Sequence, residues 1–193
     1  MMLRHAALPA AALALVACAG CSSSGVQTAS SSGENATQVS ATFAQGGNGP
    51  AFTYNPELVP AGSKVEVSSS SKDDAVTTTL KVEGLKPNRT YGAHAHVNAC
   101  SPTDGEAAGP HFQFEQDPVK PSVDPAFANP QNEIWLDVTT DAQGAGEATS
   151  TVKGSFPDDR KPKSVVIHEK ATETHAGHAG KAGSRPGCVN VEF

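Results

Sequence analysis

Histidines carry the chemistry that this sequence suggests most directly. His94 and His96 are separated by one residue, so on a β-strand both imidazoles face the same side, with their Cα atoms about 7 Å apart. That geometry suits two ligands of one metal ion. His111 lies in a stretch containing glycine and proline, and His168 follows the apolar run 164–167. Imidazole binds zinc, copper, iron and nickel, so the spacing alone does not choose the metal.

Short segments of alternating polar and apolar residues predict the strands that would hold these histidines. No segment has a convincing helical period. The candidate strands are residues 39–43, 64–67, 77–82, 90–97, 134–138, 146–152, 165–168 and 188–191. Seven or eight short strands favour an all-β fold, either an antiparallel sandwich or a Greek-key barrel. The segment 98–133 has no strand pattern, and loops of that length are usually functional.

The N-terminus predicts export. Arg4 precedes an apolar run, 6–17, which is too short to span a bilayer and is typical of a secretory signal peptide. Cys18 follows a Leu-Val-Ala tripeptide that resembles the lipobox of bacterial lipoproteins, and Cys21 is the alternative lipidation residue. A lipid there would anchor the protein to the outer face of the cell membrane. The predicted units are a signal peptide over 1–20, a Ser- and Gly-rich tether over 21–36 and a folded domain over 37–193.

The composition argues against nucleic acid as a partner. The net charge of −6 would repel a polyanion. Aromatic residues are scarce, with one Trp, two Tyr and seven Phe, so no platform for stacking bases is evident.

Six short motifs occur in a fixed order within the predicted domain. They are Gly84-Leu85-Lys86-Pro87, Tyr91-Gly92-Ala93-His94-Ala95-His96, Cys100, Gly109-Pro110-His111-Phe112, Val166-Ile167-His168-Glu169-Lys170 and Ala182-Gly183-Ser184-Arg185-Pro186-Gly187-Cys188. Together they resemble the Cu,Zn superoxide dismutase family, and the match covers nearly all of residues 37–193. The family fold is an eight-stranded antiparallel Greek-key β-barrel or sandwich with long loops.

The resemblance implies both a site and a reaction. The residues that match the copper ligands of the family are His94, His96, His111 and His168. Cys100 and Cys188 match the cysteines of its intrasubunit disulfide. Arg185 matches the arginine that lies over the copper channel and guides the anion, and His111 matches the proton carrier. The implied substrate is superoxide, which is converted to dioxygen and hydrogen peroxide.

The chain departs from the family where zinc would bind. No histidine occurs between Phe112 and Ile134, and the family's zinc histidine and zinc aspartate fall on Gln131 and Ile134. The aspartate that links the two metal sites falls on Thr172. We therefore predict copper as the cofactor without a zinc site. The second nitrogen of His111 then needs water or an acceptor, and a Glu or Asp of the long loop could serve.

His175 and His178 have no counterpart in the family pattern. They are either exposed residues of a flexible loop or an auxiliary copper site, since neighbouring neutral imidazoles bind copper. A copper donor protein is a further candidate partner. Copper storage or delivery by the same fold, without dismutation, is the alternative function, and a purely structural lipoprotein is a third. Arg185 favours the dismutase, because a carrier needs no arginine over the channel.

Overall fold

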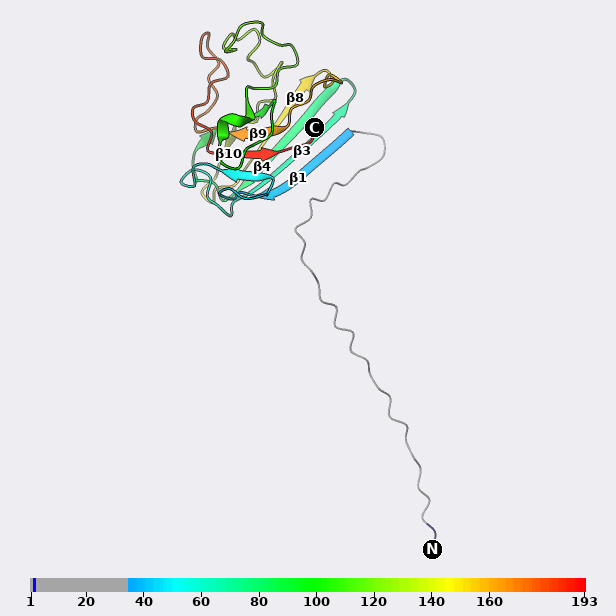
Figure 1. Cartoon of the computed structure of the whole chain (residues 1–193), viewed down its shortest axis with the longest axis vertical. Coiled ribbons are helices and arrows are strands. Elements are labelled where there is room, and N and C mark those ends of the chain that lie inside the picture. Colours follow the sequence, from blue (N-terminus) through cyan, green and yellow to red (C-terminus); the bar gives the residue numbers. More distant parts are fainter. Residues whose placement is uncertain (1, 3–34) are drawn as a thin grey trace.

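The computed structural model describes Met2 and residues 35–193 of the chain (Figure 1). The predicted signal peptide apart from Met2, the tether up to residue 34, and both candidate lipidation residues, Cys18 and Cys21, lie outside the described residues. Within the described ranges, no helix is long and apolar enough to cross a bilayer.

Two four-stranded antiparallel sheets form the body of the fold (Figure 1). The first has the order β1 (Asn35–Thr42), β3 (Lys64–Lys72), β4 (Ala75–Glu83) and β8 (Gly146–Lys153). The second has the order β2 (Ala51–Thr53), β10 (Gly187–Asn190), β9 (Ser164–Ile167) and β6 (Ala93–His96). A two-stranded ribbon joins β5 (Thr90–Tyr91) to β7 (Val138–Thr139). The predicted all-β Greek-key sandwich is confirmed, with eight strands in its two larger sheets.

The first sheet is amphipathic. Along β3 and β4 the apolar side chains face the core, and Val67 and Leu80 are fully buried. The other face carries hydroxyl groups, and Thr77 on β4 pairs with Thr151 on β8 (3.1 Å between the hydroxyl oxygens). This period of two is what the sequence pattern predicts for a sheet with one face in water.

The second sheet is buried on both faces, because β6 and β9 have no exposed residue. Ala93 and Ala95 of β6 face the hydrophobic core. The alternation then places His94 and His96 on the opposite face, under the long loops. The fold thus directs two histidines away from the core and toward the segments that cover this sheet.

Two predicted strands are shorter in the structure than the sequence pattern suggests. Residues 90–97 divide into β5 and β6 at Gly92, whose N–H donates to the carbonyl of Lys170 (2.6 Å). A Cβ at Gly92 would lie 2.7 Å from the Cβ of Ala182, so this close approach requires glycine. Of residues 134–138 only the end belongs to β7, and Trp135 forms an isolated bridge with His94. The short β2 and a 3₁₀-helix, η1 (Gly105–Ala108), were not predicted.

The two longest loops rise at the same end of the sandwich (Figure 1). The long loop runs between β6 and β7, and the second runs between β9 and β10. They touch where the N–H of Gly177 donates to the carbonyl of Val123 (3.1 Å). The long loop also returns along β6, since the N–H of Phe112 donates to Ala95 (2.8 Å) and that of Leu136 to Ala93 (2.7 Å). The long loop therefore covers the edge of β6 that no strand of the sheet pairs with.

Candidate metal centre

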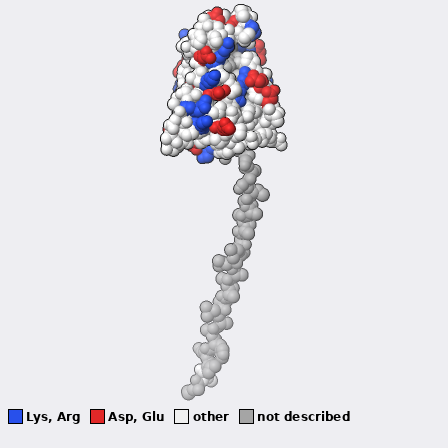
Figure 2. Space-filling model, turned by 90° about the vertical axis from the view of Figure 1, so that its left-hand side faces the viewer, with Lys and Arg blue, Asp and Glu red and all other residues white. Residues whose placement is uncertain are grey.

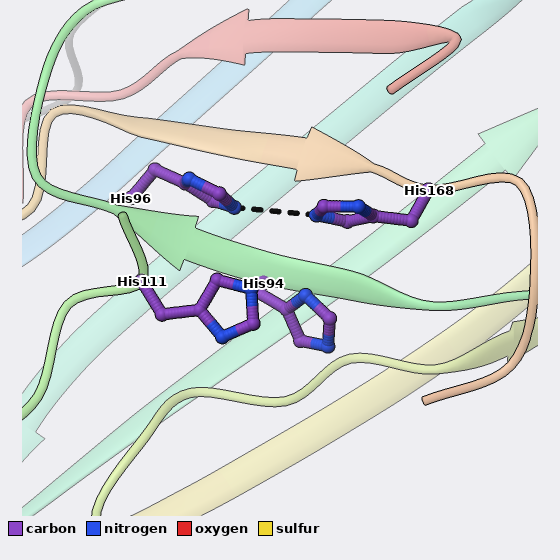
Figure 3. A group of neighbouring side chains, drawn as sticks. All are labelled: His94, His96, His111 and His168. Carbon is purple, nitrogen blue, oxygen red and sulfur yellow. Dashed lines mark hydrogen bonds between the residues drawn. The ribbon is translucent and has the colours of Figure 1, made fainter. Parts of the chain in front are cut away.

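All four histidines that match copper ligands come together above β6 (Figure 3). His94 and His96 lie on β6, and His168 directly follows β9, its antiparallel neighbour. His111 lies opposite His96 in an isolated bridge. One nitrogen of each imidazole lies within 4.8 Å of the corresponding nitrogens of the other three. A distance of 3.3 Å separates Nε2 of His96 from Nε2 of His168.

Burial keeps most of these imidazoles uncharged. The exposed fraction is 0% for His94 and His96 and 3% for His168. Loss of solvation, reinforced by the nearby His111, lowers the pKa of His168 to about 3. The same causes hold the pKa values of His94 and His96 well below the ordinary histidine value. A neutral imidazole is the form that binds metal, so the three are ready to act as ligands at neutral pH.

The outer nitrogens of two of these histidines are held by hydrogen bonds. Nδ1 of His96 donates to the carbonyl of Gly109 (2.8 Å), which leaves Nε2 directed at the cluster. Nε2 of His94 lies 2.7 Å from the hydroxyl of Thr172, which leaves Nδ1 for the cluster. That Nδ1 is buried without a hydrogen-bond partner. A buried polar atom without a partner is costly, and a metal ion bound by the four nitrogens would satisfy it.

Thr172 connects His94 to a carboxylate. Its hydroxyl lies 2.5 Å from Oδ1 of Asp137 and donates to it, and its N–H donates to Oδ2 (2.8 Å). The threonine oxygen can then accept the Nε2 proton of His94, which selects the tautomer with a free Nδ1. In the sequence, Thr172 stands where the family has the aspartate that links its two metal sites, and no role was predicted for the threonine itself. Asp137, 35 residues earlier in the chain, supplies a carboxylate through the hydroxyl, and no sequence signal pointed to it.

Glu133 holds the second nitrogen of His111. Its Oε2 lies 2.7 Å from Nδ1 of His111, and the carboxylate is almost fully buried. Two further donors hold this carboxylate, Nε1 of Trp135 (2.7 Å) and Nε2 of Gln113 (2.8 Å). Of the two predicted alternatives, water or an acidic acceptor from the long loop, the structure places an acidic side chain at this nitrogen. Trp135 and Gln113 were not predicted, because their role depends on how the loop folds back on itself.

The positions that match zinc ligands hold residues of other kinds. Gln131 is exposed, and Ile134 lies in the hydrophobic core with 1% of its surface exposed. Two aspartates of the long loop are used within that loop. Asp117 accepts from the hydroxyl of Ser122 (2.7 Å), and Asp124 accepts from the N–H of Ala126 (2.9 Å). In the described ranges, the carboxylate paired with the outer nitrogen of His111 is that of Glu133.

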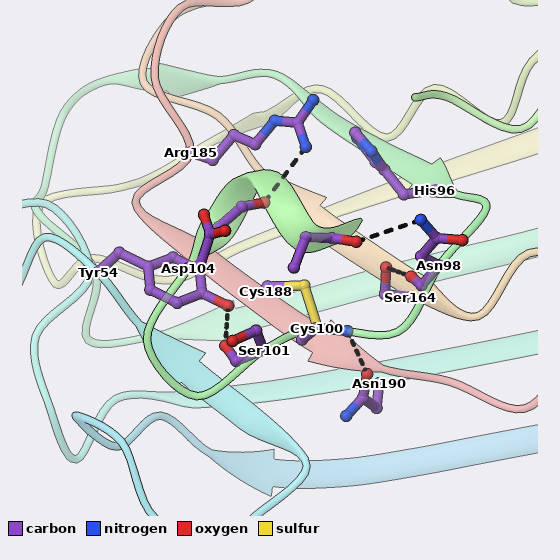
Figure 4. The surroundings of a disulfide bond; sticks show 12 residues. Tyr54, His96, Asn98, Cys100, Ser101, Asp104, Ser164, Arg185, Cys188 and Asn190 are labelled. Carbon is purple, nitrogen blue, oxygen red and sulfur yellow. Dashed lines mark hydrogen bonds between the residues drawn. A yellow bond between two sulfur atoms is a disulfide. The ribbon is translucent and has the colours of Figure 1, made fainter. Parts of the chain in front are cut away.

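Arg185 lines a cleft that leads to the histidines. The cleft has a volume of about 690 Å³, and its walls include His111 and His168. The guanidinium donates from Nη1 to the carbonyl of Gly105 (3.2 Å), and its Nε lies 3.5 Å from Oε2 of Glu106. Burial lowers the pKa of Arg185, although the group stays charged at neutral pH. Figure 4 shows its guanidinium close to the ring of His96 on one side of η1.

The predicted disulfide between Cys100 and Cys188 is confirmed (Figure 4). It joins the start of the long loop to β10. The N–H of Cys100 also donates to the side chain of Asn190 (2.7 Å). The disulfide therefore secures the segment 105–109. In this segment the carbonyl of Gly105 accepts from Arg185, and the carbonyl of Gly109 accepts from His96.

His175 and His178 do not join the four-histidine cluster. With Glu173 they form a second group of closely spaced donor atoms on the surface of the loop between β9 and β10. The sequence offered no signal for the participation of Glu173.

Comparison with known proteins agrees with this geometry. The family model of copper/zinc superoxide dismutase (SODC) matches residues 62–191. The structure is similar to that of the Cu/Zn superoxide dismutase from Brucella abortus, with a TM-score of 0.52 and 19% sequence identity over 83% of this chain and 100% of that one. At this identity the likeness shows the fold. No curated protein matches the sequence significantly. The family model covers well over half of the sequence, so the chain belongs to the copper/zinc superoxide dismutase family.

Proposed function

We propose that this protein dismutates superoxide at a four-histidine copper site that lacks zinc. The observation that supports this most strongly is the pairing of His111 with a buried glutamate, next to three buried, neutral imidazoles. Four imidazoles suit copper in both of its common oxidation states, and copper(II) binds nitrogen donors most tightly among the divalent first-row metals. Bound copper supplies one-electron chemistry, by which two superoxide ions and two protons become one dioxygen and one hydrogen peroxide.

Glu133 takes over the orienting role that zinc has in relatives with a bridging histidine. It accepts the Nδ1 proton of His111, which leaves Nε2 facing the cluster. An Nε2 atom that is not bound to metal would be free to carry a proton from solvent, with the buried carboxylate of Glu133 beside the ring. His111 is also the most exposed of the four histidines, with 16% of its side chain accessible in the cleft. Nε2 of His111 can therefore deliver a proton to the reduced substrate.

The absence of zinc is supported by three positions together. Gln131 and Ile134 replace the family's histidine and aspartate, and Thr172 replaces the linking aspartate. A structural zinc site is ordinarily closed by four ligands. His111 would be the only histidine ligand of such a zinc site. The nitrogen of His111 that would face the zinc, Nδ1, is already paired with Glu133.

We also propose that the protein works outside the cytoplasm, anchored at Cys18 or, alternatively, at Cys21. The disulfide supports export, because such bonds persist in oxidising compartments. The lipid would hold the domain on the outer face of the cell membrane through the Ser-rich segment that follows the cysteine.

The direct test is the superoxide dismutation rate of the copper-loaded domain, measured by pulse radiolysis. Arg185→Ala is expected to lower the rate roughly tenfold and to weaken its dependence on ionic strength, because the guanidinium attracts the anion into the cleft. Basic and acidic side chains are interspersed on the face shown in Figure 2.

Two variants serve as controls for this test. Arg185→Lys keeps the charge and should retain most of the salt dependence. Lys153→Ala removes an exposed cation at the end of β8 and should change neither quantity. A copper-loaded protein without dismutase activity would point instead to copper storage or delivery. An unchanged rate in Arg185→Ala would contradict the assigned role of the arginine.

A further inference from the structure

Three donor side chains lie together on the loop between β9 and β10. Oε2 of Glu173 is 3.6 Å from Nε2 of His175 and 3.3 Å from Nδ1 of His178. The two imidazole rings stack with their centroids 4.7 Å apart. All three side chains are accessible to solvent. A metal ion from solution could therefore reach each of them.

Backbone hydrogen bonds hold this arrangement. The N–H of Glu173 donates to Lys181 (2.8 Å), and that of Gly180 donates back to Glu173 (2.9 Å). The N–H of His178 donates to the carbonyl of His175 (3.0 Å), which closes a turn between the two histidines. Gly177 and Gly180 have φ values of 80° and 81°, a conformation that other residues adopt only with strain. The loop brings the three donors together before any ligand binds.

The donor set selects a class of metal. Two imidazoles and one carboxylate suit the late divalent first-row ions, and copper(II) stands highest among them in affinity. Bonds of about 2.0–2.1 Å require the donors to move slightly closer together, which exposed side chains can do by rotation. Nζ of the nearby Lys181 donates to the carbonyl of Gly177 (3.1 Å), and the ion-pair partners of Glu173 among the described residues are His175 and His178.

We propose that Glu173, His175 and His178 bind one copper(II) ion at the rim of the cleft. Glu173 lines the same cleft as His111 and Arg185. A Cβ placed on Gly180 would lie 3.5 Å from the ring of His111, so the loop contacts the four-histidine site. Copper captured from solution at this rim stands beside the path to that site. Binding is independent of dismutation, and only the capture role rests on the proposed function.

The test is a titration of copper(II) into protein that already holds one copper in the four-histidine site, followed by calorimetry and electron paramagnetic resonance. Wild type is expected to bind a second copper, whose signal shows coupling to two nitrogens. His175→Ala/His178→Ala should lose this second equivalent while keeping the first. Glu173→Gln should weaken it by about tenfold or more, as expected for loss of a direct ligand.

Matched variants separate ligand loss from general effects on the loop or on charge. Thr174→Ala changes an exposed non-donor of the same loop, and Glu57→Gln removes an exposed carboxylate elsewhere. Both should bind the second copper as wild type does. A wild type that binds only one copper, or a double histidine variant with unchanged second binding, would overturn the proposal. Dismutation is assayed separately on the singly loaded protein, so failure of that activity leaves this result interpretable.

Discussion

Replacing Cys100 and Cys188 with serine together is expected to lower the free energy of unfolding by about 4–5 kcal/mol. The disulfide joins residues 88 positions apart, and closing a loop of that length removes much of the conformational entropy of the unfolded chain. Urea denaturation of the metal-free domain measures the change. Wild type reduced by a thiol is the control, because it loses the bond without any substitution. A loss below about 1 kcal/mol in both samples would contradict the expectation.

The same variant should also lose copper affinity. The bond fixes the segment whose Gly109 carbonyl orients His96 and whose Gly105 carbonyl holds Arg185. With the disulfide removed, this segment is tied to β10 only by weaker contacts such as the bond from Cys100 to Asn190. Copper dissociation measured at a urea concentration where the variant stays folded separates this effect from global unfolding.

Acid is expected to destabilise the metal-free protein steeply. Burial lowers the pKa of His168 to about 3 and holds those of His94 and His96 well below the ordinary value of 6.5. In the unfolded chain these groups take up protons below about pH 6.5, whereas the folded protein resists protonation. The stability they contribute is thus fully present above pH 6.5 and is lost as the pH falls toward about 3, the pKa of His168 in the folded protein.

Each histidine that protonates only on unfolding removes about 1.4 kcal/mol of stability per pH unit in this window. Urea denaturation of metal-free protein at pH 7, 6, 5 and 4 measures the slope. His168→Asn should reduce the slope by about one proton. His175→Ala/His178→Ala, which removes exposed imidazoles, should follow wild type. Equal slopes for wild type and His168→Asn would show that burial of this imidazole does not control acid stability.

The sequence predicted the sheets best where one face is polar. Val65 and Val67 of β3 and Val76, Leu80 and Val82 of β4 are buried, as an alternation of apolar and polar residues predicts. The serine run 68–71 of β3 has no apolar residue and was not predicted as strand. The sequence predicted β6 less well, because Gly92 interrupts the pattern for a reason that lies elsewhere in the chain. The close approach of Lys170 and Ala182 to Gly92 exists only after folding.

The candidate site shows the same division. The four clustered histidines and the disulfide could be predicted from the ordered motifs. The residues that stand at the family's zinc positions could be found by counting along the chain. The hydrogen-bond partners of these histidines could not be predicted from the sequence. Thr172 donates to Asp137, and Trp135 and Gln113 donate to Glu133, between residues that only the folded loops bring together. Glu173 could not be predicted as a member of the second group either. A carboxylate two residues before a histidine carries no signal in the sequence, and only the folded loop places it beside both imidazoles.

Metal stoichiometry tests most directly whether the four-histidine site holds copper without zinc. His175→Ala/His178→Ala removes the auxiliary donors, so the four-histidine site can be counted alone. This variant is loaded with copper and zinc together, desalted and subjected to elemental analysis, with its dismutation rate measured on the same sample. One copper and no zinc per chain, with full activity, is the predicted result. A stoichiometric zinc that remains beside copper and is lost in His111→Ala would contradict the account.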